Sequence, residues 1–273
     1  MRRLQQSGLM LVVLMLACAT FAPLIWMVSA SFMPSGQAAT FPPPFVPRQV
    51  TLDQYVSLFT RLHLGRSLFN SIVLSVAVTL VSLLVNSMAG YAFAKYRFRG
   101  RAPLFKLLIA SMVIPAQVTM LPLFLLLNKM GLINTYFGVI IPGMASIFGI
   151  FLIRQFALSI PDSLLEAARI DGAGDFRIYW SLILPLCKPI LITLAIFTFM
   201  GTWNDFLGPL IYLTNQKDFT LALGLQFFQS QSGGTEWHYL MAASTLVVLP
   251  IIILFFFTQK TFIEGISMTG IKG

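Results

Sequence analysis

Residues 160–173 read Ile160-Pro161-Asp162-Ser163-Leu164-Leu165-Glu166-Ala167-Ala168-Arg169-Ile170-Asp171-Gly172-Ala173, a short polar stretch between two long apolar runs. The stretch predicts a helix, because Pro161 suits a first helical turn and Gly172 is a natural stop just past the end. Ser163 and Glu166 have the spacing of a capping box. A helix of roughly ten residues is shorter than the ~12–15 at which isolated helices become marginally stable in water, so we expect it to need a docking surface.

The predicted helix is amphipathic. Its apolar face, at spacings of three and four, consists of Pro161, Leu164, Leu165 and Ala168. Its polar face consists of Asp162, Glu166 and Arg169. A partner protein outside this chain is one possible source of the docking surface that the helix needs.

The rest of the chain has the composition of a membrane protein. Hydrophobic residues make up 57% of the 273 residues and charged residues 10%, with a mean hydropathy of +0.84, whereas globular domains carry about 25% charged residues. The net charge of +9 does not indicate nucleic-acid binding, because the basic residues are scattered in short loops beside apolar runs. Two cysteines and two histidines, all unclustered, support neither a disulfide framework nor a metal site.

Six apolar runs are long enough to cross the bilayer's hydrocarbon core of about 30 Å. They lie at about 9–32, 68–94, 107–127, 136–156, 189–213 and 239–258. The first run contains Val28-Ser29-Ala30, which resembles a signal-peptide cleavage site, but it exceeds the about 7–15 residues of a signal-peptide core and is interpreted as a span, with cleavage as the alternative. The sequence therefore predicts an all-α polytopic membrane protein with six transmembrane helices in a single domain, residues 1–273.

Prolines interrupt two of these runs. Pro115 and Pro122 free backbone carbonyls in the third run, so we expect a kinked helix that is buried within protein rather than exposed to lipid. The fourth run is interrupted by Pro142-Gly143.

Lysine and arginine are distributed unevenly between the two sides of the predicted bundle. When loops are assigned alternately, those on the N-terminal side hold 13 and those on the other side hold 5. Basic residues mark the cytoplasmic side, so both termini and residues 159–188 are predicted to be cytoplasmic. Residues 33–66, with a short amphipathic helix near 52–62, and residues 214–238 are then external loops.

Polar residues in the second and fifth runs are candidates for a solute path. The second run carries a stripe at helical spacing: Ser71, Ser75, Thr79, Ser82 and Asn86. Polar groups are costly against lipid, so the stripe is expected to face other helices or a wet cavity, and both interpretations remain open. In the fifth run, Asp205 requires water or polar partners, which pore lining and a structural hydrogen bond both supply. The candidate path residues are Ser75, Thr79, Asn86, Gln117, Trp203, Asn204 and Asp205.

The stretch quoted first resembles a family signature. Glu166-Ala167-Ala168, three residues, Gly172, nine residues and Leu182-Ile183-Leu184-Pro185 are similar to the EAA motif of ABC-importer permeases, EAA-x3-G-x9-I-x-L-P. The one departure is Leu182 in place of Ile, a volume-conserving exchange. The alternative is an ordinary amphipathic connector between spans.

Other stretches resemble the second permease of maltose-type carbohydrate importers. They are Ala89–Phe98, Trp203–Leu210, Thr220–Leu225 and the closing Gly270-Ile271-Lys272-Gly273. By this resemblance the stretch from Glu166 to Gly172 is a cytoplasmic coupling helix, and the ATPase-coupling residues are Glu166, Ala167, Ala168, Arg169, Asp171, Gly172, Leu184 and Pro185.

The resemblance also implies the partners. They are a second permease subunit, a dimer of ATPase subunits, an extracytoplasmic solute-binding protein and a carbohydrate substrate, in the cytoplasmic membrane of a bacterium. ATP and Mg are then held by the ATPase, so this chain binds no cofactor and is not an enzyme. The loop 214–238 corresponds to one that contacts the binding protein, and the polar tail 259–273 to one near the ATPase interface.

Two other functions fit the sequence less well. An ion-coupled secondary transporter would use Asp205 as its coupling carboxylate, but paired intramembrane charges and inverted repeats are absent from the sequence. An intramembrane enzyme would need a nucleophile and a base in register, and no histidine or cysteine is so placed.

Overall fold

The computed structural model describes the backbone of residues 2–60, 64–231 and 236–270 and the side chains of residues 6–60, 64–229 and 236–259. Within these residues the chain is all-α, with no strand, as predicted. The predicted loop residues 232–235 and the last three residues of the closing motif, 271–273, lie outside the described part.

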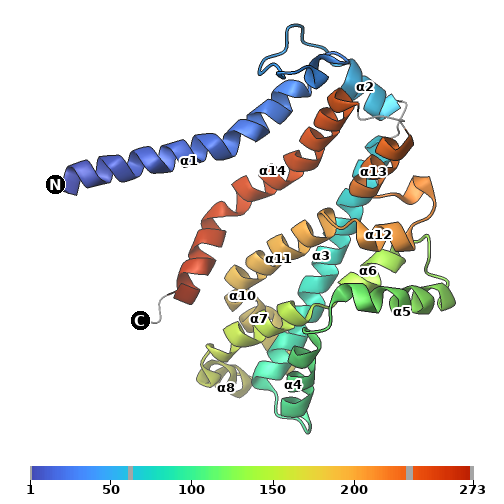
Figure 1. Ribbon diagram of the computed structural model, residues 1–273. Coiled ribbons are helices and arrows are strands. Elements are labelled where there is room, and N and C mark those ends of the chain that lie inside the picture. The colour runs from blue at the N-terminus through green and yellow to red at the C-terminus, as the bar shows by residue number, and fades with distance from the viewer. Residues whose placement is uncertain (1, 61–63, 232–235, 271–273) are drawn as a thin grey trace. The chain divides into compact units, whose positions relative to one another are not determined.

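The longest helices, α1, α3 and α14, follow apolar runs, and shorter helices lie between them along the described chain (Figure 1). Their bounds are α1 Arg2–Ala30, α2 Asp53–Thr60, α3 Leu64–Lys95, α4 Arg101–Ser111, α5 Ala116–Lys129, α6 Phe137–Gly143, α7 Ile147–Leu158, α8 Asp162–Ile170, α9 Asp175–Ile178, α10 Leu184–Leu186, α11 Lys188–Trp203, α12 Leu207–Tyr212, α13 Leu221–Gln231 and α14 Trp237–Gly270. A π-helical turn, Tyr179–Ile183, joins α9 to α10.

Three segments are long and apolar enough to cross a membrane alone: Gln6–Ala30 of α1, all of α3, and Trp237–Gln259 of α14. Three bent pairs also qualify, which makes six candidate spans among the described residues if each pair crosses once. The pairs are α4 with α5, α6 with α7, and the segment Asp175–Leu186 with α11. The exact boundaries of the predicted spans stay predictions.

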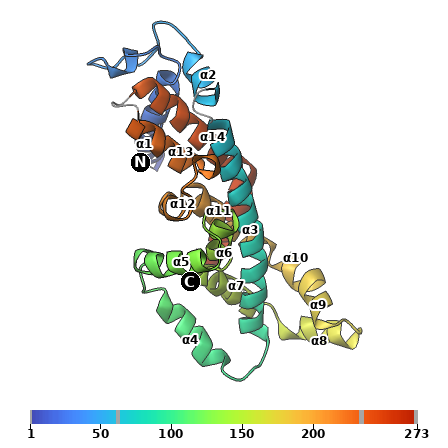
Figure 2. The same cartoon turned by 90° about the vertical axis from the view of Figure 1, so that its right-hand side faces the viewer.

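The third run, 107–127, is bent, as its prolines predict, and the bend is sharp enough to divide it. It belongs to two helices, α4 and α5, which meet at an angle of 106° (Figure 2). Pro115 explains the break, because it has extended backbone (ψ 136°) and no N–H to continue a helix. Leu107, Val113 and Leu121 are exposed on this chain, so the expected burial of the run, which a partner subunit would have to complete, stays a prediction.

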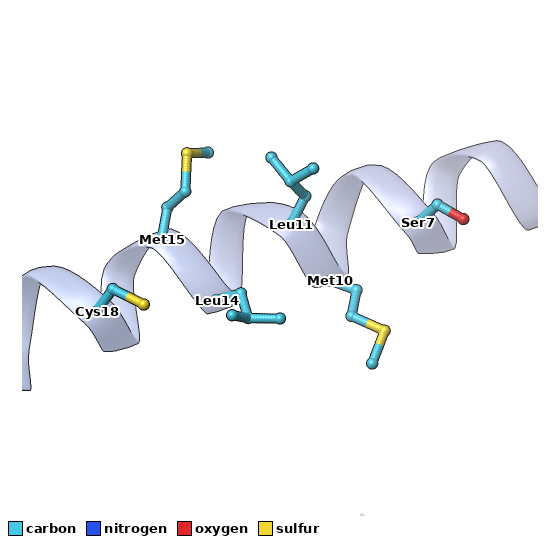
Figure 3. A pocket seen from close by; sticks show the side chains of 6 residues that line it. All are labelled: Ser7, Met10, Leu11, Leu14, Met15 and Cys18. Atoms are coloured by element: carbon cyan, nitrogen blue, oxygen red, sulfur yellow. The ribbon is translucent and has the colours of Figure 1, made fainter.

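The described chain divides into two compact units, residues 1–66 with 223–252, and residues 67–222 with 253–273. In the first unit, none of the apolar window of α1 is buried. Figure 3 shows six of its side chains, spaced three and four residues apart along the helix: Ser7, Met10, Leu11, Leu14, Met15 and Cys18. This face of α1 is therefore available to lipid or to another subunit.

The second unit is organised around α3, whose polar stripe is buried. Asn70 donates from Nδ2 to the carbonyls of Lys217 and Phe219 (3.0 Å each) and accepts from the Tyr136 hydroxyl (2.6 Å). Ser71 Oγ accepts from the Leu221 N–H (2.7 Å). These side chains satisfy backbone groups at the ends of neighbouring segments, so this part of the stripe is used for packing.

Further along α3, small residues allow close helix contact. A Cβ on Gly90 would lie 2.7 Å from Ile153 Cβ and 3.0 Å from the Arg154 N atom of α7. Asn86, fully buried, donates to Ser82 Oγ (2.7 Å) and accepts from the Ser146 N–H (2.9 Å) at the start of α7. Gly90 therefore allows α3 and α7 to pack closely, and the Asn86 side chain fixes where α7 begins along α3.

We expect Gly90→Ala to lower stability by about 1–3 kcal/mol, because the added methyl group overpacks the α3–α7 contact. The measurement is the thermal unfolding midpoint of the purified protein in detergent. Gly8→Ala in α1 is the matched control, because a Cβ there meets no atom within 4 Å. Equal midpoints for the two variants would contradict the packing role of Gly90.

Candidate functional site

The predicted polar helix is α8, and it ends as expected. Gly172 has a φ of 82°, in the left-handed region that favours glycine. Its N–H donates to the Arg169 carbonyl (3.0 Å), and the Ala173 N–H donates to the Ala168 carbonyl (2.9 Å). This pair of bonds is a Schellman motif. A Cβ on Gly172 would meet no atom within 4 Å, so the backbone angle, and not lack of space, requires glycine.

The start of α8 differs from its prediction. The helix begins at Asp162, and Pro161 precedes it with extended backbone and no side-chain cap. Ser163 and Glu166 lie inside the helix, so the predicted capping box is wrong. Asp162 instead places a negative charge in the first turn, where it interacts favourably with the positive end of the helix dipole.

One side of α8 docks on the chain itself. Leu165 is 4% exposed and lies in a buried cluster, here called the docking cluster. Its buried members are Tyr91, Ile153, Ile160, Leu165, Ile178, Tyr179, Ile183, Cys187, Ile190 and Leu194. Ala168 and Ala173 pack against it, whereas Leu164, predicted on the same face, is 44% exposed. The chain therefore supplies part of the dock that so short a helix needs.

A lysine ties the start of α8 to the end of α3. Lys95 Nζ donates to Asp162 Oδ1 (2.6 Å) and to the Ile160 carbonyl, and its side chain is only 7% exposed. This contact lowers the pKa of Asp162, so the ion pair is present at neutral pH and is lost only as the pH falls through that lowered value. α8, α9 and α10 lie together beside the C-terminal end of α3 (Figure 2).

A second ion pair closes the turn after α8. Arg169 Nη2 lies 3.1 Å from Asp175 Oδ1, and the contact raises the pKa of the guanidinium. Both side chains are more than half exposed, so the pair adds little stability by itself. It links α8 to α9 across Gly172.

The other side of α8 and its turn is exposed and partly apolar. Ile170 is 86% exposed and Phe176 is 69% exposed. Glu166, Ala167 and Asp171 are exposed on the same segment. Of the more distant predicted coupling residues, Leu184 packs against the docking cluster and Pro185 is exposed in α10.

A separate cavity of about 460 Å³ lies within the second unit. Its walls come from α3, α5, α6, α11 and α12, and its polar lining consists of Gln117, Thr119, Thr202, Asp205 and Tyr212. The structure thus brings together two of the predicted path residues, Gln117 and Asp205. Thr119 and Thr202 were missed, because neither stands out in an apolar run.

Asp205 lines the cavity and also accepts a hydrogen bond from the backbone. Its Oδ1 accepts from the Gly208 N–H (3.2 Å) at the start of α12, where the run 189–213 breaks into two helices. A Cβ on Gly208 would lie 2.5 Å from Asp205 Oδ2, so the glycine leaves room for the carboxylate. The Asn204–Pro209 sequence therefore forms the break between α11 and α12, and the Asp205 side chain caps the start of α12.

The remaining path candidates do not line this cavity. Ser75, Thr79 and Asn86 are buried in α3. Trp203 is 2% exposed and stacks on Phe199. Asn204 is exposed and donates to the Met200 carbonyl (2.9 Å).

Three residues of the coupling region were also missed from sequence. Lys95 lies within the stretch Ala89–Phe98 but was assigned no coupling role, and its partner lies 67 positions away. Ile170 and Phe176 carry no signal beyond being apolar in a polar stretch. Among the described residues, no group of three or more His, Cys, Asp or Glu is placed to hold a metal ion.

Comparison with known proteins agrees with these features. Residues 86–267 match the family described as binding-protein-dependent transport system inner membrane component. The arabinooligosaccharides transport system permease protein AraQ of Halalkalibacterium halodurans is 39% identical over 254 residues, which cover 92% of this chain and 91% of that protein. The sn-glycerol-3-phosphate transport system permease protein UgpE of Yersinia enterocolitica is 36% identical over 203 residues, 74% of this chain and 72% of that protein.

A solved structure is also similar. A chain of a bacterial ABC transporter involved in the import of the acidic polysaccharide alginate gives a TM-score of 0.83 at 25% identity, covering 95% of this chain and 97% of that chain. The resemblance drawn from the EAA motif is confirmed. The chain belongs to the family of inner membrane components of binding-protein-dependent transport systems.

Proposed function

We propose that this chain is a permease subunit of an ATP-driven importer of sugars or sugar derivatives. The observation that carries the proposal is the segment from α8 to α9. One side of α8 is fixed to the membrane helices, and Ile170 of α8 and Phe176 of α9 are exposed to a partner. The relatives' names, which refer to arabinooligosaccharides and sn-glycerol-3-phosphate, support the substrate class. Solute arrives from an external binding protein, and a second permease subunit completes the passage.

In this proposal, ATP and Mg are bound by a dimer of ATPase subunits, and α8 with its turn seats on one of them. Closure of the ATPases moves α8, and two attachments pass the motion on. Lys95 connects α8 to α3, and Leu165 connects it to the docking cluster, which includes Ile153 of α7. The bundle then alternates between outward and inward access.

The proposed orientation follows from the loop charges. α8 and both termini lie on the cytoplasmic side of the inner membrane, and the loops 33–66 and 214–238 lie outside. This places the exposed side of α8 where ATP and its ATPase are found.

The cavity lined by Gln117 and Asp205 is the proposed contribution of this chain to the solute passage. Its polar side chains suit hydroxyl-rich solutes, because hydroxyls both donate and accept hydrogen bonds. The ion-coupled alternative is not retained: the Asp205 carboxylate already accepts a hydrogen bond that caps α12, and the similar proteins reported above are transport-system permeases and an ABC importer.

We expect uptake to depend on the left-handed backbone at position 172. Gly172→Ala strains the turn by about 1–2 kcal/mol, whereas Gly172→Asn is tolerated better because asparagine adopts this conformation more readily. Uptake should fall in the order Gly, Asn, Ala at equal amounts of inserted protein, as measured with radiolabelled solute. Equal uptake in all three would show that the turn has no coupling role.

Lys95→Met should reduce uptake strongly while the ATPase subunits still bind, because it removes the ion pair with Asp162 and the hydrogen bond to the Ile160 carbonyl, which together fix the start of α8. Asp162→Asn should have a weaker effect, since the bond to the Ile160 carbonyl remains. The double variant should be no worse than Lys95→Met, and Lys95→Arg should restore part of the uptake. Additive losses would mean that the two side chains do not act as a pair.

The partner surface is tested by Ile170→Asp and Phe176→Asp. Each should abolish co-purification of the ATPase subunits, because it places a charge in an apolar contact. The exposed Arg177→Gln variant, on the same segment, is the control and should retain them. Wild-type recovery of ATPase with both aspartate variants would contradict the proposed function.

A further inference from the structure

The external end of α1 is joined to an unusually apolar loop. No Asp, Glu, Lys, Arg or His occurs between Arg3 and Arg48. The span Gln6–Ala30 occupies the first part of this uncharged stretch, and the loop from Ser31 to Pro47 occupies the rest. In the loop, Phe41 is 97% exposed, Val46 is 68% exposed and Phe45 is 54% exposed. Three such side chains in one loop indicate a site of contact with lipid or with another protein.

The base of the loop is fixed by hydrogen bonds within the same compact unit. The Thr51 N–H donates to the Phe32 carbonyl (3.0 Å). From α2, Gln54 donates to the Ser31 carbonyl and the Tyr55 hydroxyl donates to Ser31 Oγ (2.8 Å). These bonds hold both ends of the loop close to the C-terminal end of α1 (Figure 1).

That path runs back along the span. The Trp26 indole N–H donates to the Pro44 carbonyl (3.0 Å), and the Ser29 hydroxyl donates to the Phe45 carbonyl (2.6 Å). Pro43 and Phe45 line a shallow pocket together with three residues of α1, Ala22, Pro23 and Trp26. At 1.5 Å per residue, Trp26 lies about 6 Å and Ala22 about 12 Å before the end of the helix at Ala30. The loop therefore lies beside the last turns of a membrane span.

The backbone of this segment suits a low-dielectric environment. Pro42, Pro43 and Pro44 have no N–H groups, so three donors that would need partners are missing. The carbonyls of Pro44 and Phe45 are satisfied by side chains of α1. These features reduce the number of backbone polar groups in the segment that need water as a partner.

We propose that residues 41–46 form an anchor that inserts into the boundary between lipid headgroups and acyl chains, in the leaflet at the C-terminal end of α1. Phe41, Phe45 and Val46 enter the acyl region, Trp26 occupies the interface in the manner of an aromatic belt, and the exposed Arg48 meets lipid phosphates. The anchor fixes the depth of α1. Only the naming of this leaflet as the outer one rests on the proposed function.

The test measures depth directly. Single cysteines at Phe41 and Val46, in a Cys18→Ala, Cys187→Ala background, are spin-labelled in the transporter purified with its partner subunits and placed in phosphatidylcholine–phosphatidylglycerol nanodiscs. Relaxation by oxygen, which concentrates in lipid, is compared with relaxation by a water-soluble nickel chelate. Ser35, exposed in the same loop, is the control. We expect an oxygen-to-nickel ratio several-fold higher at 41 and 46 than at 35.

Two results would overturn the anchor. A ratio at 41 and 46 equal to that at 35 would place the loop in water. Low accessibility to both reagents would mean that a protein surface, such as the second permease or the binding protein, covers it. Neither result depends on whether the chain transports, so the anchor and the proposed function can fail separately.

A second variant tests the hydrogen bond between the Trp26 side chain and the Pro44 carbonyl. Trp26→Phe keeps an aromatic ring but removes the N–H that holds the Pro44 carbonyl, so the ratio at Val46 should fall toward that of Ser35. Phe21→Trp, on exposed α1 surface away from the loop contacts, is the matched aromatic exchange and should leave the ratio unchanged. An unchanged ratio in Trp26→Phe would show that the loop is not held beside the span by this bond.

Discussion

The attachment of α8 to the membrane helices is the contact on which the account depends. A nine-residue helix has little stability of its own. It is kept folded and oriented by Leu165 in the docking cluster, by Lys95 at its start and by the Schellman motif at its end. Because these contacts reach α3 and α7, a force applied to the exposed side of α8 acts on the bundle rather than only on a loop.

The same logic governs α3. In lipid, a polar side chain is stable only when it is paired, and α3 pairs Asn70, Ser71 and Asn86 with backbone groups at the ends of neighbouring segments. The stripe thus fixes where the elements packed on α3 begin and end, and Gly90 sets how closely α7 approaches. The helix that receives α8 at one end is also the helix on which the rest of its unit is built.

Much of this was accessible from sequence, and the failures have physical causes. Gly172 was predictable because the turn after a helix favours glycine, and membrane class followed from composition. Lys95 was missed because its contact with Asp162 is long-range, and no local pattern encodes it. The capping box failed because Pro161 had already set the helix start. The third run was predicted as one kinked helix, because Pro115 indicates a bend but not that the bend reaches 106°.

If the proposed function holds, ATP hydrolysis by separate ATPase subunits drives this bundle through α8. The most direct measurement is solute uptake by proteoliposomes that contain the purified transporter, with ATP enclosed on the α8 side and all ion gradients collapsed by ionophores. We expect uptake that requires ATP and the ATPase subunits and is unaffected by the ionophores. Uptake by this chain and its permease partner alone, driven by an ion gradient, would contradict the proposed function.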